Sequence, residues 1–138
     1  PQMSTLVFAA QLEEIADGAA AIREATGRQC VYFRPPHGNY NASTLQAARA
    51  AGEIVTLWDV DPGDWRTLSP EEIRARVIGH ARSPAVILLH NGKDATIEAL
   101  PGIVGAYRRA GFTFTTLSAL QRRLPLEAIN DPLRVTIR

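Results

Sequence analysis

The stretch Cys30-Val31-Tyr32-Phe33-Arg34-Pro35-Pro36-His37-Gly38 decides how this chain folds. Its apolar start, residues 30–33, is typical of the end of a buried strand. The two prolines fix the backbone and remove two N–H donors, and Gly38 lets the chain turn back sharply. An arginine at a strand end beside a rigid turn can hold a carboxylate through two hydrogen bonds. The stretch therefore predicts either a site at a strand end or a surface turn with a solvated arginine.

Helix and strand patterns alternate on both sides of this stretch. Apolar periodicity and helix-start residues predict helices over residues 10–26, 41–51, 69–81 and 118–123, and a further helix that ends near Ala110. Its start is uncertain because it contains Pro101. Either Asn41 or Ser43 can cap the helix over residues 41–51. Strand patterns cover residues 31–33, 53–58, 85–89 and 112–117. This order, with short connections, predicts an α/β fold of parallel strands joined by right-handed helical crossovers. The expected inward side chains of the helices include Ile22, Ile78 and Leu100.

Polar clusters follow three of the expected strands directly. They comprise residues 34–38, 61–65 and 90–92. The carboxyl ends of parallel strands lie on one rim of a sheet or barrel, where active sites are usually built. The convergence of these clusters is the best physical indication of a site in the sequence.

The chemistry-bearing residues of that rim are a histidine and two acids. His90 can act as a general acid or base, or it is a structural histidine at a strand end. Asp64 can accept a hydrogen bond from one ring nitrogen of His90 and so fix its tautomer. Asp61 can take this part instead, or it can cap the turn at Pro62-Gly63.

Other residues near the rim have two interpretations each. Trp65 either belongs to the core or forms the wall of a pocket for a sugar or a small apolar group, and Leu88 is core or shares that wall. The backbone N–H of His37 can contribute to an oxyanion hole. His80 lies opposite the apolar stripe of its helix and is expected to face solvent.

Composition excludes several classes of protein. The 138 residues are enough for one domain, and 15 Lys plus Arg against 14 Asp plus Glu give a net charge of +1. That balance gives no basic face for nucleic acid, and no apolar run is long enough to span a membrane. Cys30 is the only cysteine, so no disulfide forms within the chain, and we expect it to fill the core.

Three motifs in order resemble the polysaccharide deacetylases of the NodB-homology type, carbohydrate esterase family 4. They are residues 34–38, Asp61-Pro62-Gly63-Asp64-Trp65 and Leu88-Leu89-His90. The resemblance covers roughly residues 1–120 and implies part of a distorted (β/α) barrel with the motifs at strand ends. It also implies a metal-dependent hydrolase that removes N- or O-acetyl groups from a carbohydrate polymer such as chitin, peptidoglycan or acetylxylan. Such an enzyme is expected to be secreted or to lie at the cell surface.

The resemblance implies a role for each matching residue. Arg34 would hold the catalytic-base aspartate, and Asp64 would orient His90, which would protonate the leaving amine or alkoxide. The N–H of His37 would face the oxyanion, while Trp65 and Leu88 would line the pocket of the acetyl methyl group. The substrate-binding residues are expected to be Trp65, Leu88, His37, Pro36, Gly38 and Asp61.

The sequence departs from the family in two of its motifs. The family binds a divalent metal, usually zinc or cobalt, through an Asp and two His from a T-F-D-D and an H-x-x-x-H stretch, and neither stretch is present. We therefore expect residues 1–123 to be the C-terminal portion of a deacetylase domain and residues 124–138 to be a tail, where 135–137 are a possible edge strand. This chain alone would be inactive, would expose an open sheet edge, and would need a complementary N-terminal fragment.

Two alternatives remain beside an enzyme that deacetylates polysaccharides. One is a non-catalytic carbohydrate-binding remnant that uses the groove at Trp65. The other is a deacetylase of a small amide, such as an acetylated polyamine. Retention of Arg34, Asp64 and His90 favours the deacetylase over the binder, because a binder has no use for an arginine whose partner is a catalytic aspartate.

Overall fold

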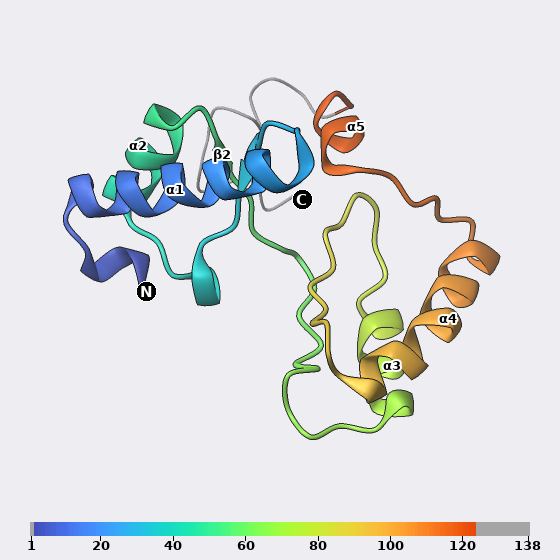
Figure 1. The fold of residues 1–138 in the computed structure, drawn as a ribbon. Coiled ribbons are helices and arrows are strands. Elements are labelled where there is room, and N and C mark those ends of the chain that lie inside the picture. The colour runs from blue at the N-terminus through green and yellow to red at the C-terminus, as the bar shows by residue number, and fades with distance from the viewer. Residues whose placement is uncertain (1, 124–138) are drawn as a thin grey trace. The chain divides into compact units, whose positions relative to one another are not determined.

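The computed structural model describes residues 2–123 (Figure 1). These residues fall into two compact units, one up to Leu57 and one from Trp58 onward. The elements of the first unit are η1 Met3–Thr5, α1 Phe8–Thr26, β1 Tyr32–Phe33, η2 Pro36–Gly38, α2 Ala42–Ala50 and β2 Ile54–Val55. Those of the second unit are α3 Pro70–Gly79, α4 Asp94–Arg109 and α5 Leu117–Gln121. Within the described part of the chain, no helix is both long and apolar enough to cross a membrane.

The first unit contains the expected parallel sheet in a short form. β1 pairs in parallel with β2, with Tyr32 opposite Ile54 and Phe33 opposite Val55. The N–H of Ile54 donates to the carbonyl of Val31 at 2.8 Å, and the N–H of Thr56 donates to the carbonyl of Phe33 at 2.8 Å. α2 makes the crossover between the two strands, as parallel pairing requires. The parallel α/β arrangement predicted from the sequence is therefore present, although each strand is two residues long.

The core of the first unit lies between α1, α2 and β2. It consists of Met3, Ile15, Ala47, Ala48 and Val55. The expectation that Ile22 faces this core is wrong, because its side chain is 50% exposed. α1 has 19 residues and α2 has nine, so α2 is too short to cover the whole length of α1. Cys30 is half-buried, so it does not fill the core as expected.

The sequence signals for the starts of α2 and α3 correspond to real caps. The Asn41 side chain accepts from the N–H of Thr44 at 3.0 Å, and the Thr44 hydroxyl accepts from the N–H of Asn41 at 3.1 Å. Ser69 and Glu72 form the same reciprocal box, with distances of 3.2 and 2.8 Å. Each box pairs two N–H groups that a helix start leaves without intrahelical partners.

The second unit is built on the packing of α3 against α4. Its core consists of Ile73, Val77, Ala99, Ile103 and Tyr107. The Tyr107 hydroxyl donates to the carbonyl of Val77 at 3.1 Å and so ties the two helices together. α4 begins at Asp94 and continues through Pro101. Leu100 is 44% exposed and Ile78 is 37% exposed, so both were wrongly expected to face inward. Each lies beside the buried face of its helix, about 100° away from the neighbouring core residue.

Two strands expected in the second unit do not form as regular strands. In place of a strand over residues 85–89, the structure has a single parallel bridge between Val60 and Ile87. Residues 112–116, the greater part of the expected last strand, have no strand structure. The Phe112 and Phe114 rings instead pack against Tyr107, with ring centroids 5.1 and 6.1 Å away. An apolar pattern gives a strand only where a neighbouring strand pairs with it. The possible edge strand at 135–137 lies outside the described residues.

Candidate active site

The Asp64–His90 pair is the centre of the candidate site. Asp64 is 2% exposed, and its Oδ1 lies 2.7 Å from Nδ1 of His90. The backbone N–H of His90 donates to Oδ2 of the same carboxylate at 2.7 Å. A carboxylate only accepts, so Nδ1 carries the shared hydrogen and Nε2 is the ring nitrogen left for a substrate. The His90 side chain is 40% exposed, which is compatible with proton exchange at that nitrogen.

The surroundings of Asp64 keep its carboxyl group ionised. Burial by itself raises the pKa of Asp64, because it disfavours the charged form. Four interactions lower the pKa of Asp64, and together they outweigh the effect of burial. They are the backbone and side-chain hydrogen bonds from His90, the hydrogen bond from the hydroxyl of Thr96 and the charge of His90. The pKa of Asp64 is therefore lowered. A charged carboxylate holds one tautomer of the imidazole and stabilises its protonated form.

Asp61 caps the turn at Pro62-Gly63, which is the second of the two roles that the sequence allows it. Its Oδ1 accepts from the N–H of Gly63 at 2.8 Å and so caps the turn, while Asp64 contacts His90. Gly63 has φ of 71°, a left-handed conformation that favours glycine. Arg76 of α3 donates to the carbonyl of Pro62 at 3.1 Å. This turn delivers Asp64 into the interior.

Asp59, which the sequence analysis did not single out, holds the segment that carries His90. Its side chain is fully buried, and its Oδ2 accepts from the N–H of Val86 at 2.8 Å. Its Oδ1 forms an ion pair with Arg82 at 2.9 Å. The N–H of Leu88 then donates to Val60 at 2.9 Å. Contacts from Asp59 and Asp64 thus set the register of residues 86–90. No local sequence signal marks Asp59, since its partners lie more than 20 residues away along the chain.

Trp65 and Leu88 are the residues expected to line an acetyl pocket. The Trp65 side chain is 50% exposed, so the core interpretation of this residue is wrong. The guanidinium of Arg66 lies 4.8 Å from the centroid of the Trp65 ring. Leu88 is half-buried. The exposed indole follows Asp64 directly along the chain and is available to contact a ligand.

Arg34 and His37 belong to the first unit and are described within it. Arg34 is exposed at the end of β1, and Pro35 is buried. His37 has φ of 58° and ψ of 12°, a left-handed conformation that is uncommon for a residue with a side chain. Gly38 is also left-handed, with φ of 68°, and its N–H donates to Pro35 at 2.9 Å. The turn that includes Pro36 is therefore tight, and its backbone is held in a strained form.

A divalent metal does not fit the residues that the structure describes. Among residues 2–123, no three side chains of His, Cys, Asp or Glu come together in a group that could hold a metal ion. His37 lies in the first unit, and His80 and His90 lie in the second.

His80 is exposed, as expected for a solvent-facing residue, and its Nδ1 lies 2.7 Å from the carbonyl of Arg76.

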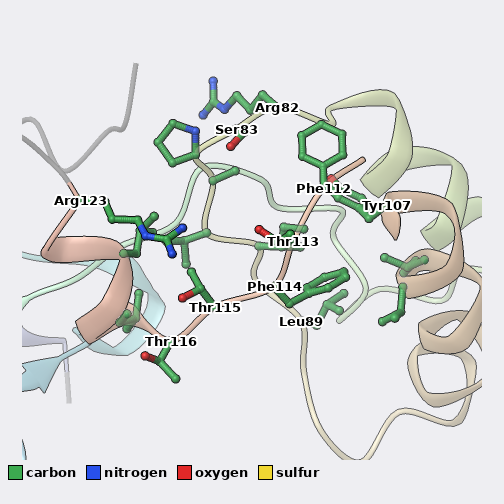
Figure 2. A pocket seen from close by; sticks show the side chains of 18 of the residues that line it. Arg82, Ser83, Leu89, Tyr107, Phe112, Thr113, Phe114, Thr115, Thr116 and Arg123 are labelled. Atoms are coloured by element: carbon green, nitrogen blue, oxygen red, sulfur yellow. The ribbon is translucent and has the colours of Figure 1, made fainter. Parts of the chain in front are cut away.

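The second unit also contains a cavity of about 370 Å³ (Figure 2). Its apolar lining includes Leu89, Tyr107, Phe112 and Phe114, and its polar lining includes Arg82 and the threonines 113, 115 and 116. The described lining contains neither Asp64 nor His90. This cavity is therefore not the expected acetyl pocket.

Comparisons in sequence and structure agree on one family. The family model of polysaccharide deacetylases matches residues 1–54. The chain is 34% identical over 100 residues to a peptidoglycan-N-acetylglucosamine deacetylase of Bacillus cereus, covering 69% of this chain and 47% of that protein. It is 28% identical over 135 residues to a chitooligosaccharide deacetylase of a Bradyrhizobium species, covering 87% of this chain and 62% of that protein.

A solved structure of the same family shares the fold of this chain. A family 4 carbohydrate esterase from Streptomyces lividans, in complex with acetate, matches with a TM-score of 0.81 and 31% identity. The match covers 88% of this chain and 62% of that one. The chain thus spans about half the length of the Bacillus cereus relative and about three fifths of the esterase. By the family model, the sequence likeness and the fold, the chain belongs to the polysaccharide deacetylase family.

Proposed function

We propose that this chain carries the proton-donating half of a polysaccharide deacetylase, with His90 as the acid and Asp64 as its orienting partner. The observation that carries the proposal is the 2.7 Å contact between Nδ1 of His90 and Oδ1 of the buried Asp64. The substrate class is an acetylated polysaccharide or oligosaccharide of the chitin, peptidoglycan or acetylxylan type. The named activities of the relatives support this class.

The residues of this chain act on the second step of the proposed hydrolysis. When the tetrahedral intermediate collapses, the bond from the former carbonyl carbon to the amine nitrogen or alkoxide oxygen breaks. The leaving group takes the proton from Nε2 of His90, and Asp64 stabilises the imidazolium before that transfer. Trp65 and Leu88 line the site of the acetyl methyl group. Arg34 holds the catalytic base, and the N–H of His37 faces the oxyanion.

The chain alone is proposed to be inactive. Hydrolysis also requires an activated water and a polarised carbonyl, and the described residues offer no metal-binding group that would supply them. A complementary N-terminal part of the same kind of domain would bring the base and the ligands for zinc or cobalt. Residues 1–123 would then be the C-terminal portion of one domain, and the complete protein would act outside the cell or at its surface.

A carbohydrate-binding remnant is the second candidate function. The observation in its favour is the exposed ring of Trp65, since sugars stack on exposed indole rings. This alternative predicts that chitin oligomers bind to the chain whether or not His90 is present. The buried Asp64, which pairs with both the backbone and the ring of His90, argues against it, because a stacking surface needs no oriented imidazole.

A chimera separates these functions. The N-terminal part of the Bacillus cereus relative, up to the region matched here, is joined to this chain, and release of acetate from chitin oligomers is measured with zinc or cobalt present. We expect the chimera to be active, the chain alone to be inactive, and His90→Ala to lower kcat at least about 100-fold. His80→Ala is the matched control, because His80 is an exposed histidine in the same unit, at the C-terminal end of α3. Activity of the chain alone, or full activity of a folded His90→Ala chimera, would refute the proposal.

A further inference from the structure

Asp64 has a third hydrogen-bond partner that the motifs do not contain. The hydroxyl of Thr96, a residue in the first turn of α4, donates to Oδ2 of Asp64 at 2.9 Å. Thr96 is 4% exposed, so water does not compete freely for this bond. Oδ2 thus accepts from Thr96 and from the backbone of His90, while Oδ1 accepts from the His90 ring.

We propose that Thr96 is a positioning residue that fixes the rotation of the Asp64 carboxylate and thereby the orientation of the His90 ring. This inference rests on the proposed role of His90. The last torsion of an aspartate side chain is soft, with a broad two-fold preference. A donor from a separate element restricts that torsion in a way that the two donors of His90 cannot, because His90 moves with its own segment. The β-branched side chain of Thr96 is itself restricted about its first torsion.

The packing of α4 explains why Thr96 can hold the carboxylate firmly. Ala99, Ile103 and Tyr107 follow Thr96 at helical spacing and are buried in the core of the second unit. The hydroxyl therefore projects from a helix that is anchored over most of its length. The start of a helix also carries a partial positive charge, which favours a carboxylate near the first turn. The same anchoring connects the candidate site to the helix pair α3 and α4.

The test compares variants that differ only in the Thr96 hydroxyl or methyl group. Thr96→Val keeps the shape and removes the donor, and Thr96→Ser keeps the donor and removes the methyl group. Thr113→Val is the control, since Thr113 is exposed in the same unit. The full chain, labelled with 15N-histidine, is examined by NMR for the hydrogen on Nδ1 of His90 and for its rate of exchange with water. Thermal midpoints show whether each variant is folded.

We expect Thr96→Val to raise that exchange rate about tenfold, while the serine and control variants stay within about twofold of the parent. In the active chimera, the valine variant should lower kcat about tenfold and leave KM nearly unchanged. An unchanged exchange rate in folded Thr96→Val, or a serine variant as fast as the valine variant, overturns the inference. Should the valine variant not fold, Thr96→Ala is measured against the same outcomes. The NMR signal needs no substrate, so an inactive chimera would count against the proposed function and not against Thr96.

Discussion

Replacement of Asp59 by alanine is expected to lower the free energy of unfolding more than any change to its ion-pair partner. The Asp59 side chain is fully buried and accepts the N–H of Val86, whereas the Arg82 side chain is 47% exposed. The Val86 N–H is part-buried, and leaving such a donor without an acceptor costs at most about 1–3 kcal/mol, the range for buried groups. Loss of a surface ion pair adds about 0–1 kcal/mol. The sum predicts a loss of about 1–4 kcal/mol for Asp59→Ala.

Two further variants divide that sum into its parts. Asp59→Asn keeps a carbonyl oxygen for Val86 and loses the charge, so we expect a cost of about 1 kcal/mol. Arg82→Ala leaves the Val86 bond intact and opens Asp59 to water on one side, so it should cost no more than about 1 kcal/mol. Both tryptophans of the chain, Trp58 and Trp65, lie in the second unit, and their fluorescence in urea reports its unfolding. A larger cost for Arg82→Ala than for Asp59→Ala would refute the reasoning.

The remaining predictions concern two buried acids and a helix cap. Burial raises the pKa of Glu53, so its charged form opposes folding, and stability falls as pH rises from its unfolded pKa to its folded pKa. Glu53→Gln should therefore raise the urea midpoint of the first unit at pH 7 and flatten the change of that midpoint as pH rises above about 4. Both tryptophans lie in the second unit, so circular dichroism of the helices of the first unit is the readout for this variant. The pKa of Asp64 is lowered, so its ionised form stabilises the folded state. This stabilisation is complete above about pH 4, the unfolded pKa, and is lost as pH falls through the folded pKa. Asp64→Asn should make the acid limb of the stability curve shallower, and an unchanged limb would contradict the assigned hydrogen bonds. Ser69→Ala should cost about 1 kcal/mol in the same urea assay, and no change would mean that the cap at α3 does not stabilise the helix.

Local chemistry explains what the sequence could predict. The starts of α2 and α3 are marked by Asn41 and Ser69, whose side chains satisfy backbone donors within three residues. The strand patterns predict that an acid of residues 61–65 pairs with His90, because parallel strand ends share one rim, and they leave Asp61 and Asp64 as alternatives. The family resemblance favours Asp64, and the coordinates agree, since only the direction of each side chain distinguishes two acids in the same turn.

Tertiary packing explains what the sequence could not predict. Thr96 reaches Asp64 only because α4 packs on α3, and no local pattern distinguishes it from other threonines at a helix start. The strand pattern at residues 112–117 indicates a capacity to pair, and the described part of the chain provides no paired neighbour for it. The phenylalanines of that segment pack on Tyr107 instead.

The most direct test of the central claim is the tautomer of His90 in the intact chain. The hydrogen bond to Asp64 keeps the ring hydrogen of His90 on Nδ1 and leaves Nε2 for the leaving group. 15N NMR of histidine-labelled chain near neutral pH distinguishes the two ring nitrogens in the parent and in Asp64→Asn. We predict that neutral His90 carries its hydrogen on Nδ1 in the parent and shifts toward the Nε2-bound form in the variant. An Nε2-bound hydrogen in the parent, unchanged by Asp64→Asn, would contradict the account.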